Sequence, residues 1–175
     1  MTQCWRDALL VGVAVFSTIG CAGTRMSAPQ NLRPLPEPVT TIALAPSGGV
    51  LADAIGTELF NHGLQVIDTQ QMSTYMVRWN LNEIELLRPA NLQTMRNQGI
   101  SAFLSARTVA GYDGKPQSAS IRVVSTANGE LIAAVNWQNG RGGAQGSPAD
   151  AMMRKDIVAA AEEIGKALAK QLNRD

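Results

Sequence analysis

The sequence predicts an α/β fold, a mixed-sheet α/β sandwich with the element order β-α-β-α-α-β-β-β-α. Three observations lead to this prediction. Between residues 41 and 99, short apolar runs alternate with stretches whose apolar residues recur every three or four positions, a pattern typical of alternating strands and helices. From residue 100 onward, apolar and β-branched runs are separated by turn residues, and the chain closes on a long amphipathic stretch. Because such helices bury their apolar faces on a sheet, we expect one domain over residues 39–175.

The first predicted strand and helix lie next to each other. Residues 41–45 form an apolar run closed by Pro46, which favours a short buried strand over a helix. Apolar residues at four-residue spacing, beginning with Leu51, then precede Gly63. This spacing predicts an amphipathic helix that ends at the glycine.

A second strand and two further helices complete the first half. The second strand is predicted over residues 64–67, and Asp68 or Thr69 can cap the helix that follows. Pro89 suits the first turn of another helix, because its missing N–H costs nothing there, and Gly99 ends that helix.

Three antiparallel strands are predicted in series after residue 100. The first covers residues 100–109, and residues 112–116 carry the turn chemistry that reverses the chain. The other two, 120–126 and 130–137, flank Ala127-Asn128-Gly129. This tripeptide is a strong hairpin signal, because asparagine and glycine accept positive φ.

The last helix has the clearest signal in the chain. Ser147 can cap it, Pro148 fits its first position and Asp150 favours the positive end of the helix dipole. Apolar residues then repeat every three or four positions as far as Leu172, which predicts one continuous helix. The glycine-rich segment 140–146 before it is interpreted as a mobile connection.

The first twenty residues are predicted to be a secretory signal peptide. Ala8–Phe16 is a nine-residue apolar run, too short to cross a bilayer of roughly 30 Å as a helix but suited to the core of a signal. The segment Thr18-Ile19-Gly20-Cys21 resembles a bacterial lipobox, which implies that Cys21 is lipidated and becomes the first residue of the mature protein. The alternatives are an uncleaved anchor and an ordinary signal peptide with a chance cysteine.

Residues 21–38 are predicted to be the lipidated cysteine and a proline-rich tether. Four of the eight prolines lie here, and proline fixes φ and removes a hydrogen-bond donor, so an extended spacer is expected. At about 3.1 Å per residue, the spacer reaches at most on the order of 50 Å. Ala22 stands where an aspartate in bacterial lipoproteins marks retention at the inner membrane, so the expected location is the periplasmic face of the outer membrane.

Composition excludes several classes of protein. The chain has 175 residues and a formal net charge of +1, so it lacks the basic excess of a general nucleic-acid binder. Its two cysteines and one histidine are too few for a soft-ligand metal site or a disulfide scaffold. We therefore expect no metal, no cofactor and no nucleic-acid partner. Trp79 and Trp137 suit either core packing or an exposed interface.

Each catalytic pattern lacks a part. His62 stands alone at a predicted helix end, where a cation suits the macrodipole, and no metal-site or hydrolase motif surrounds it. Ser47-Gly48-Gly49 lies at a strand-to-helix junction but lacks the lysine of a phosphate loop. Glu83 and Glu85 would share one face of a strand, with no aromatic pocket to separate their pKa values as a catalytic pair requires. We therefore expect a protein that is not an enzyme and has no catalytic residue.

Several segments resemble one family of bacterial envelope lipoproteins. The matching segments follow the order of that family's elements: Thr41-Ile42-Ala43-Leu44-Ala45-Pro46, residues 51–68, residues 90–104, and Ile121-Arg122-Val123-Val124 with Gly129-Glu130-Leu131. At the hairpin, Ser125 and Asn128 replace the family's aspartate and threonine. The family includes the curli secretion channel subunit, the outer-membrane activator of a penicillin-binding protein and the ring-forming lipoprotein of Pel polysaccharide export. Its members share a domain similar to the N-terminal domain of TolB.

The resemblance implies an anchored, non-catalytic domain that offers surfaces to envelope proteins, among them copies of itself. The loops are too short for the transmembrane hairpins of the channel subunit, and the tether is shorter than that of the activator. We therefore expect an outer-membrane-anchored periplasmic lipoprotein, a scaffold or ring subunit in envelope assembly or export. The alternatives are a monomeric activator of a peptidoglycan synthase, and a hydrolase or small-ligand binder that uses the Ser47 turn.

Overall fold

The computed structural model describes residues 23–31, 33–35 and 37–173. The predicted signal peptide and Cys21 lie outside these residues. The strands are β1 (Arg25–Ser27), β2 (Thr41–Leu44), β3 (Gln65–Ile67), β4 (Ala102–Ala110), β5 (Pro116–Ser125) and β6 (Leu131–Gln138). The helices are α1 (Gly49–Asn61), α2 (Thr69–Trp79), α3 (Pro89–Asn97), α4 (Pro148–Met153) and α5 (Ile157–Leu172), with 3-10 turns η1 (Pro46–Gly48) and η2 (Glu83–Glu85).

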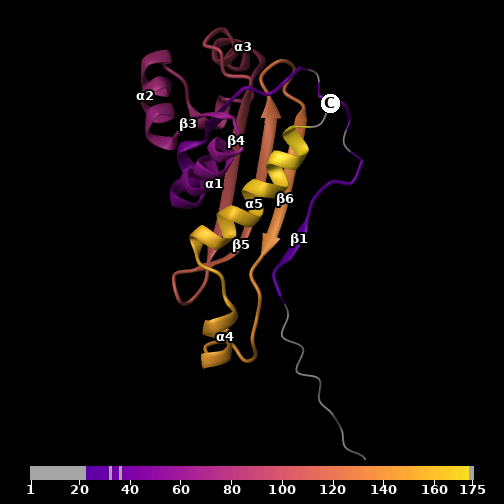
Figure 1. The fold of residues 1–175 in the computed structure, drawn as a ribbon. Helices are drawn as coiled ribbons and strands as arrows, with labels where there is room; N and C mark the ends of the chain where they lie inside the picture. The colour runs from indigo at the N-terminus through magenta and orange to yellow at the C-terminus, as the bar shows by residue number, and fades with distance from the viewer. Residues whose placement is uncertain (1–22, 32, 36, 174–175) are drawn as a thin grey trace, which may run out of the picture.

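The described strands form one mixed sheet in the order β1-β6-β5-β4-β2-β3 (Figure 1). β2 pairs in parallel with β3 and β4, and the other neighbours pair antiparallel. The turn between β5 and β6 contains Gly129 with a φ of 75°, which glycine adopts without steric cost. The mixed-sheet α/β sandwich is therefore confirmed, and so is the hairpin within it.

The main hydrophobic core lies between the sheet and the pair α1 and α5. It contains the inward side chains of β2, β4, β5 and β6, among them Leu104, Ile121 and Trp137, which are almost fully buried. The two helices pack closely, because a Cβ placed on Gly165 would lie 2.5 Å from the Cβ of Glu58. Glycine at position 165 therefore sets the distance between α1 and α5.

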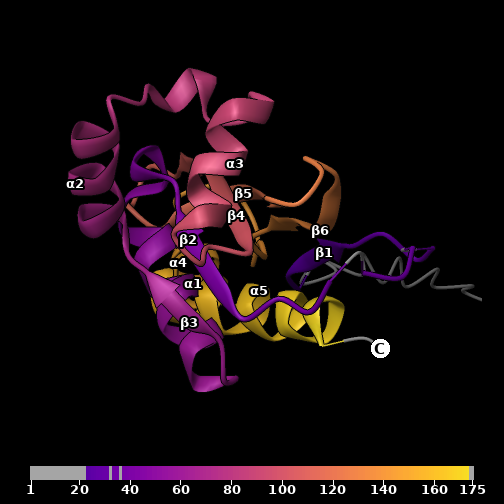
Figure 2. The ribbon, with the colours of Figure 1, turned by 90° about the horizontal axis from the view of Figure 1, so that it is seen from above.

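The opposite face of the sheet is only partly covered. A smaller core of buried residues that includes Met72, Met95 and Phe103 joins α2, η2 and α3 to the β2 and β4 end. Seen from above, no described helix lies on this second face over β6 and β1 (Figure 2). Arg122 of β5 and Asn136 of β6 are exposed on this second face. The molecule thus has one closed face and one half-open face.

Strand β1 lies within the range predicted as a tether. Its three residues pair with the end of β6, and Arg25 faces Gln138 in the register. Leu35 and Val39 also pack against the main core, and Glu37 forms an ion pair with Arg96 at 2.7 Å. The described residues of this stretch therefore make contacts along the domain.

The last helix is broken, which corrects the prediction of one continuous helix. Helix α4 ends at Met153, and Arg154 has extended dihedral angles, φ −79° and ψ 126°. Asp156 then caps α5 by accepting a hydrogen bond from the Ala159 N–H at 2.9 Å. Lys155 between them is fixed by its N–H bond to Asn139 at 2.9 Å. Tertiary contacts of residues 154 and 155 outweigh the helical periodicity.

None of the helices in the described part of the chain is both long enough and apolar enough to cross a membrane.

Candidate functional site

The structure brings Ser47 and Glu83 together and places Glu85 elsewhere. The Ser47 N–H donates to Glu83 at 3.2 Å, and its hydroxyl also donates to that carboxylate. Glu85 instead pairs with Arg88 at 2.8 Å. Glu83 and Glu85 lie in the 3-10 turn η2 and not on a strand, so their carboxylates bind different partners.

His62, Trp79 and Trp137 occupy structural positions. His62 caps the end of α1 and is exposed, as expected for a helix-end residue. Trp79 stacks on Tyr75 with ring centroids 5.0 Å apart and packs against the smaller core. Trp137 is 1% exposed and donates its indole N–H to Glu163 at 2.7 Å. Among residues 23–173 that are described, no cluster of His, Cys, Asp or Glu side chains is placed to hold a metal ion.

The half-open face of the sheet carries a groove of about 740 Å³ beside η2. Its lining includes Ser47, Glu83 and, from β4, Phe103. Its apolar lining includes Ile84, 92% exposed, and Leu87, 55% exposed. Exposed apolar side chains gathered in one groove are typical of a binding surface.

Two arginines line the same groove from neighbouring strands. Arg122 of β5 is paired across the ladder with Ser105 of β4, and Arg107 lies one diagonal position away. Both are exposed, and neither forms an ion pair with any residue that the structure describes. Arg107 also lines a second hollow of about 460 Å³ that extends over β6 to β1. The groove therefore combines apolar contact area with two unpaired cations.

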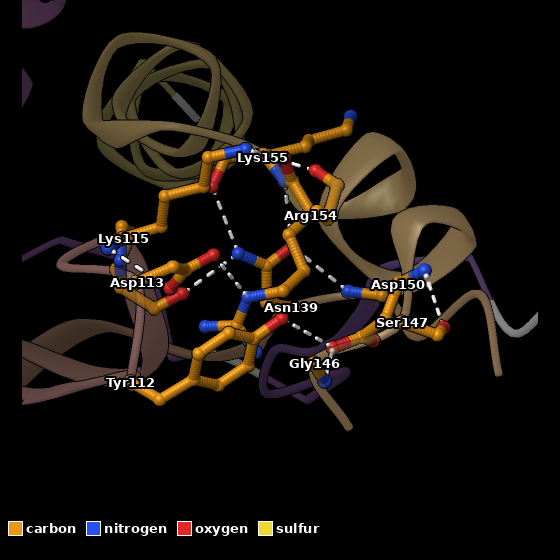
Figure 3. Close-up of polar contacts among 12 residues, drawn as sticks. Tyr112, Asp113, Lys115, Asn139, Gly146, Ser147, Asp150, Arg154 and Lys155 are labelled. Carbon is orange, nitrogen blue, oxygen red and sulfur yellow. Dashed lines mark hydrogen bonds and ion pairs between the residues drawn. The ribbon is translucent and has the colours of Figure 1, made fainter. Parts of the chain in front are cut away.

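A separate polar cluster holds α4 against the turn between β4 and β5 (Figure 3). The Tyr112 hydroxyl donates to Asp150 at 2.9 Å, and the Arg154 guanidinium donates to Asp113 at 2.9 Å. The Arg154 guanidinium also lies 5.3 Å from the centre of the Tyr112 ring. Asn139 donates to the carbonyls of Pro116 and Lys155. Asp150 and Arg154 are almost fully buried, so this cluster fixes the orientation of α4.

The pKa values in this cluster follow from its hydrogen bonds. The bond between Tyr112 and Asp150 raises the pKa of the tyrosine and lowers that of the aspartate. Burial alone would raise the pKa of Asp113, but the Lys115 N–H and the charge of Arg154 outweigh it and keep that pKa below its ordinary value. Both carboxylates are therefore held in the charged form. One oxygen of Asp150 and one terminal nitrogen of Arg154 lack a hydrogen-bond partner among the described residues.

Glu163 of α5 links the N-terminal segment to the core. It accepts hydrogen bonds from the Thr24 hydroxyl at 3.1 Å and from Lys155. Partial burial would raise the pKa of Glu163, but the hydrogen bonds from Lys155, Trp137 and Thr24 outweigh burial and lower it. Residue 24 is thus tied to the domain immediately before β1.

Sequence reasoning did not single out the groove arginines or the exposed side of α4. The sequence does carry a signal for Arg122. Ser118, Ser120 and Arg122 alternate with apolar residues, and this alternation marks the solvent face of a strand. The exposed methionines of α4 have no such signal, since the same residues fit the apolar face of one continuous helix.

No protein-family model matches the chain, and no match is found among curated proteins. Solved structures do resemble it in fold. The PelC dodecamer of Paraburkholderia phytofirmans is 14% identical, with 87% of this chain and 99% of that chain covered and a TM-score of 0.48. The lipoprotein GNA1162 of Neisseria meningitidis is 18% identical, with 74% and 99% covered and a TM-score of 0.47. TolB of Acinetobacter baumannii is 14% identical, with 85% and 31% covered and a TM-score of 0.49.

Proposed function

We propose that this protein is an outer-membrane-anchored periplasmic lipoprotein that acts as a non-catalytic scaffold or ring subunit in envelope assembly or export. The observation that carries the proposal is the half-open sheet face with its groove. Ile84, Leu87 and Leu131 are all about half exposed or more there, beside the unpaired Arg107 and Arg122. Apolar area flanked by arginine is characteristic of protein interfaces.

The lipid anchor is proposed from the lipobox-like segment that ends at Cys21. Several acyl chains on one cysteine hold a protein firmly to a membrane, whereas one chain binds only marginally. An anchored subunit also stays near partners in the same membrane, because anchoring raises the effective concentration of one near the other. Anchor and groove together suit a subunit that collects other envelope proteins.

The anchor is tested by replacing Cys21 in the full chain. Cys21→Ala should move the protein out of the outer-membrane fraction, and the acyl-modified mature mass should disappear from the mass spectrum. The matched control is Cys4→Ala, which changes the cysteine inside the predicted signal and should leave both results unchanged. Continued outer-membrane fractionation of Cys21→Ala would show that lipid is not the attachment.

The scaffold role is tested by reversing charge in the groove. Wild-type protein should cross-link in cells into complexes larger than a monomer, and Arg107→Glu with Arg122→Glu should abolish them without lowering the unfolding temperature. Lys166→Glu with Lys170→Glu is the matched control, because these lysines are exposed on α5 at the opposite face of the sheet. A monomeric wild type, or loss of complexes only in the control, would overturn the proposal.

A further inference from the structure

Helix α4 has its polar and apolar sides reversed relative to an ordinary surface helix. Its only charged residue, Asp150, is 1% exposed and points into the cluster with Tyr112. The side chains that face solvent are all apolar: Pro148, Ala149, Ala151, Met152 and Met153. Met152 is 86% exposed. A surface helix normally buries the apolar side and exposes the charges, so this orientation calls for an apolar environment outside the protein.

The buried polar cluster around Asp150 and Arg154 fixes this orientation of α4. Asp150 is held by the Tyr112 hydroxyl, and Arg154 at the end of the helix is held by Asp113. A Cβ on Gly142 would lie 2.1 Å from the Ala149 carbonyl oxygen, so the preceding loop packs directly against α4. A rotation of α4 that buried its methionines would either expose these charged groups or remove their partners. Leaving a buried charge without its partner is unfavourable.

The described part of the chain begins at this same end of the sheet. Arg25 begins β1 opposite Gln138, the last residue of β6, and the loop after β6 leads into α4. Figure 1 shows the start of β1 and helix α4 at the same end of the sheet. In the sequence Cys21 is two residues before Gly23, which is the first residue that the structure describes.

The charges at this end fit an anionic surface. Gly23, Arg25 and Arg141 line one hollow of about 230 Å³ between the start of β1 and the loop before α4. Arg25 and Arg141 are exposed and form no ion pair with a residue in the described ranges. The carboxylates of Asp113, in the turn after β4, and of Asp150, on α4, are turned inward (Figure 3), whereas Asp156 at the start of α5 is exposed. Basic side chains beside exposed apolar ones are the composition of a segment that lies in a membrane interface.

We propose that α4, with Arg25 and Arg141, is a membrane-seating surface, hereafter the α4 surface, which rests on the phospholipid headgroups of the leaflet that holds the lipid anchor. This inference rests on the lipid anchor proposed above. The anchor supplies the binding energy, and the α4 surface fixes which end of the domain faces the membrane. The groove beside η2 then points away from the membrane or along it, where other envelope proteins have access.

The α4 surface is tested with a fluorescent probe on a single cysteine. The full chain carrying Met152→Cys is expressed, purified from membranes in detergent, labelled with a polarity-sensitive fluorophore and reconstituted into phosphatidylethanolamine and phosphatidylglycerol vesicles. With Cys4 removed in the signal and Cys21 acylated, residue 152 is the only free thiol. The matched control is Val77→Cys on α2, because Val77 is 84% exposed and Met152 is 86% exposed.

The α4 surface predicts a blue shift of the label at position 152 on reconstitution and its quenching by lipids that carry a nitroxide near the headgroup. The label at position 77 should show neither change. Adding Arg25→Glu and Arg141→Glu to Met152→Cys should reduce the quenching in vesicles that contain phosphatidylglycerol.

Flotation of the vesicles separates failure of the anchor from failure of the α4 surface. If the protein floats but the label at 152 is not quenched, the anchor stands and the α4 surface is wrong. A label at 152 that is shielded from water and yet not quenched by lipid would mean that protein covers α4, which also overturns the inference. If the protein does not float, the anchor fails and the inference fails with it.

Discussion

At the scale of single residues, Glu163 joins three separate parts of the chain. It accepts hydrogen bonds from Thr24, Trp137 and Lys155, which come from the N-terminal segment, the sheet and the break before α5. Its pKa is lowered because these hydrogen bonds outweigh the effect of partial burial. The ionised form of Glu163 therefore stabilises the folded chain.

The first prediction concerns the pH dependence of this stabilisation. Because the pKa of Glu163 is lower in the folded state, its contribution is complete above the ordinary value of 4.5 and is lost as the pH falls through the lower folded value. Glu163→Gln should lower the free energy of unfolding near neutral pH and reduce its loss on acidification. Urea denaturation at a series of pH values measures both effects.

The control for this prediction is Glu162→Gln, an exposed neighbour on the same helix. It should leave the pH dependence of the wild type unchanged. Equal pH dependence in Glu163→Gln and wild type would contradict the prediction.

A second prediction separates the scaffold role from chemistry at Ser47. Its hydrogen bonds to Glu83 are exposed, so Ser47→Ala should cost at most about 1 kcal/mol of stability. It should also restore a deletion strain to wild-type behaviour, while Arg107→Glu with Arg122→Glu should not. The opposite pattern of complementation would favour a hydrolase or ligand binder at this turn.

At the scale of secondary-structure elements, the contact between α1 and α5 limits which residues the chain tolerates. Gly165→Ala places a methyl group 2.5 Å from the Glu58 Cβ, and neither atom is the end of a flexible side chain. We expect a loss of about 1–3 kcal/mol from overpacking. Chemical denaturation measures it, with Lys166→Ala on the exposed side of α5 as control. A Gly165→Ala variant as stable as this control would show that the helices move apart freely.

Elements with strong local patterns were predictable, and those set by distant contacts were not. The periodic apolar residues of α1 and the turn at Asn128-Gly129 gave the right elements. The break at Arg154 depends on Asp113, 41 residues earlier, and no local pattern announces such a pair. Strand β1 is three residues long with every residue exposed, so it lacks the alternation by which strands are recognised.

At the scale of the whole molecule, the N-terminal segment belongs to the domain more than the expected boundary at residue 39 implies. Leu35 packs on the main core, β1 pairs with β6, and Thr24 binds Glu163. The fully extended reach expected of the tether would require these contacts to open. The lipid anchor proposed at Cys21 would therefore hold the domain close to the membrane.

This arrangement predicts that the position of the N-terminus changes stability. A chain starting at Val39 should unfold at lower denaturant concentration than one starting at Ala22, because it lacks β1 and the packing of Leu35. Burial of one large apolar side chain alone corresponds to about 1.5–3 kcal/mol. Equal midpoints for the two chains would show that residues 22–38 add nothing to the fold.

The groove could be only partly predicted from sequence. Ser47 and Glu83 were singled out separately, but their contact, and the arrival of Arg107 and Arg122 beside them, depends on the packing of η2 against the sheet. Residues brought together from four segments share no spacing in the sequence. Arg107 and Arg122 share one face of the sheet because of the register in which β4 and β5 pair, and the sequence pattern does not show this register.

The two outer strands of the sheet, β1 and β3, are each only three residues long. Long open edges recruit further strands and lead to aggregation, and short ones resist it. Lipoproteins confined to one leaflet meet one another far more often than molecules free in solution. With the lipid anchor proposed above, the short outer strands would therefore let copies of this domain crowd in two dimensions without growing into fibres. Regular contacts between copies would then fall to the faces of the molecule.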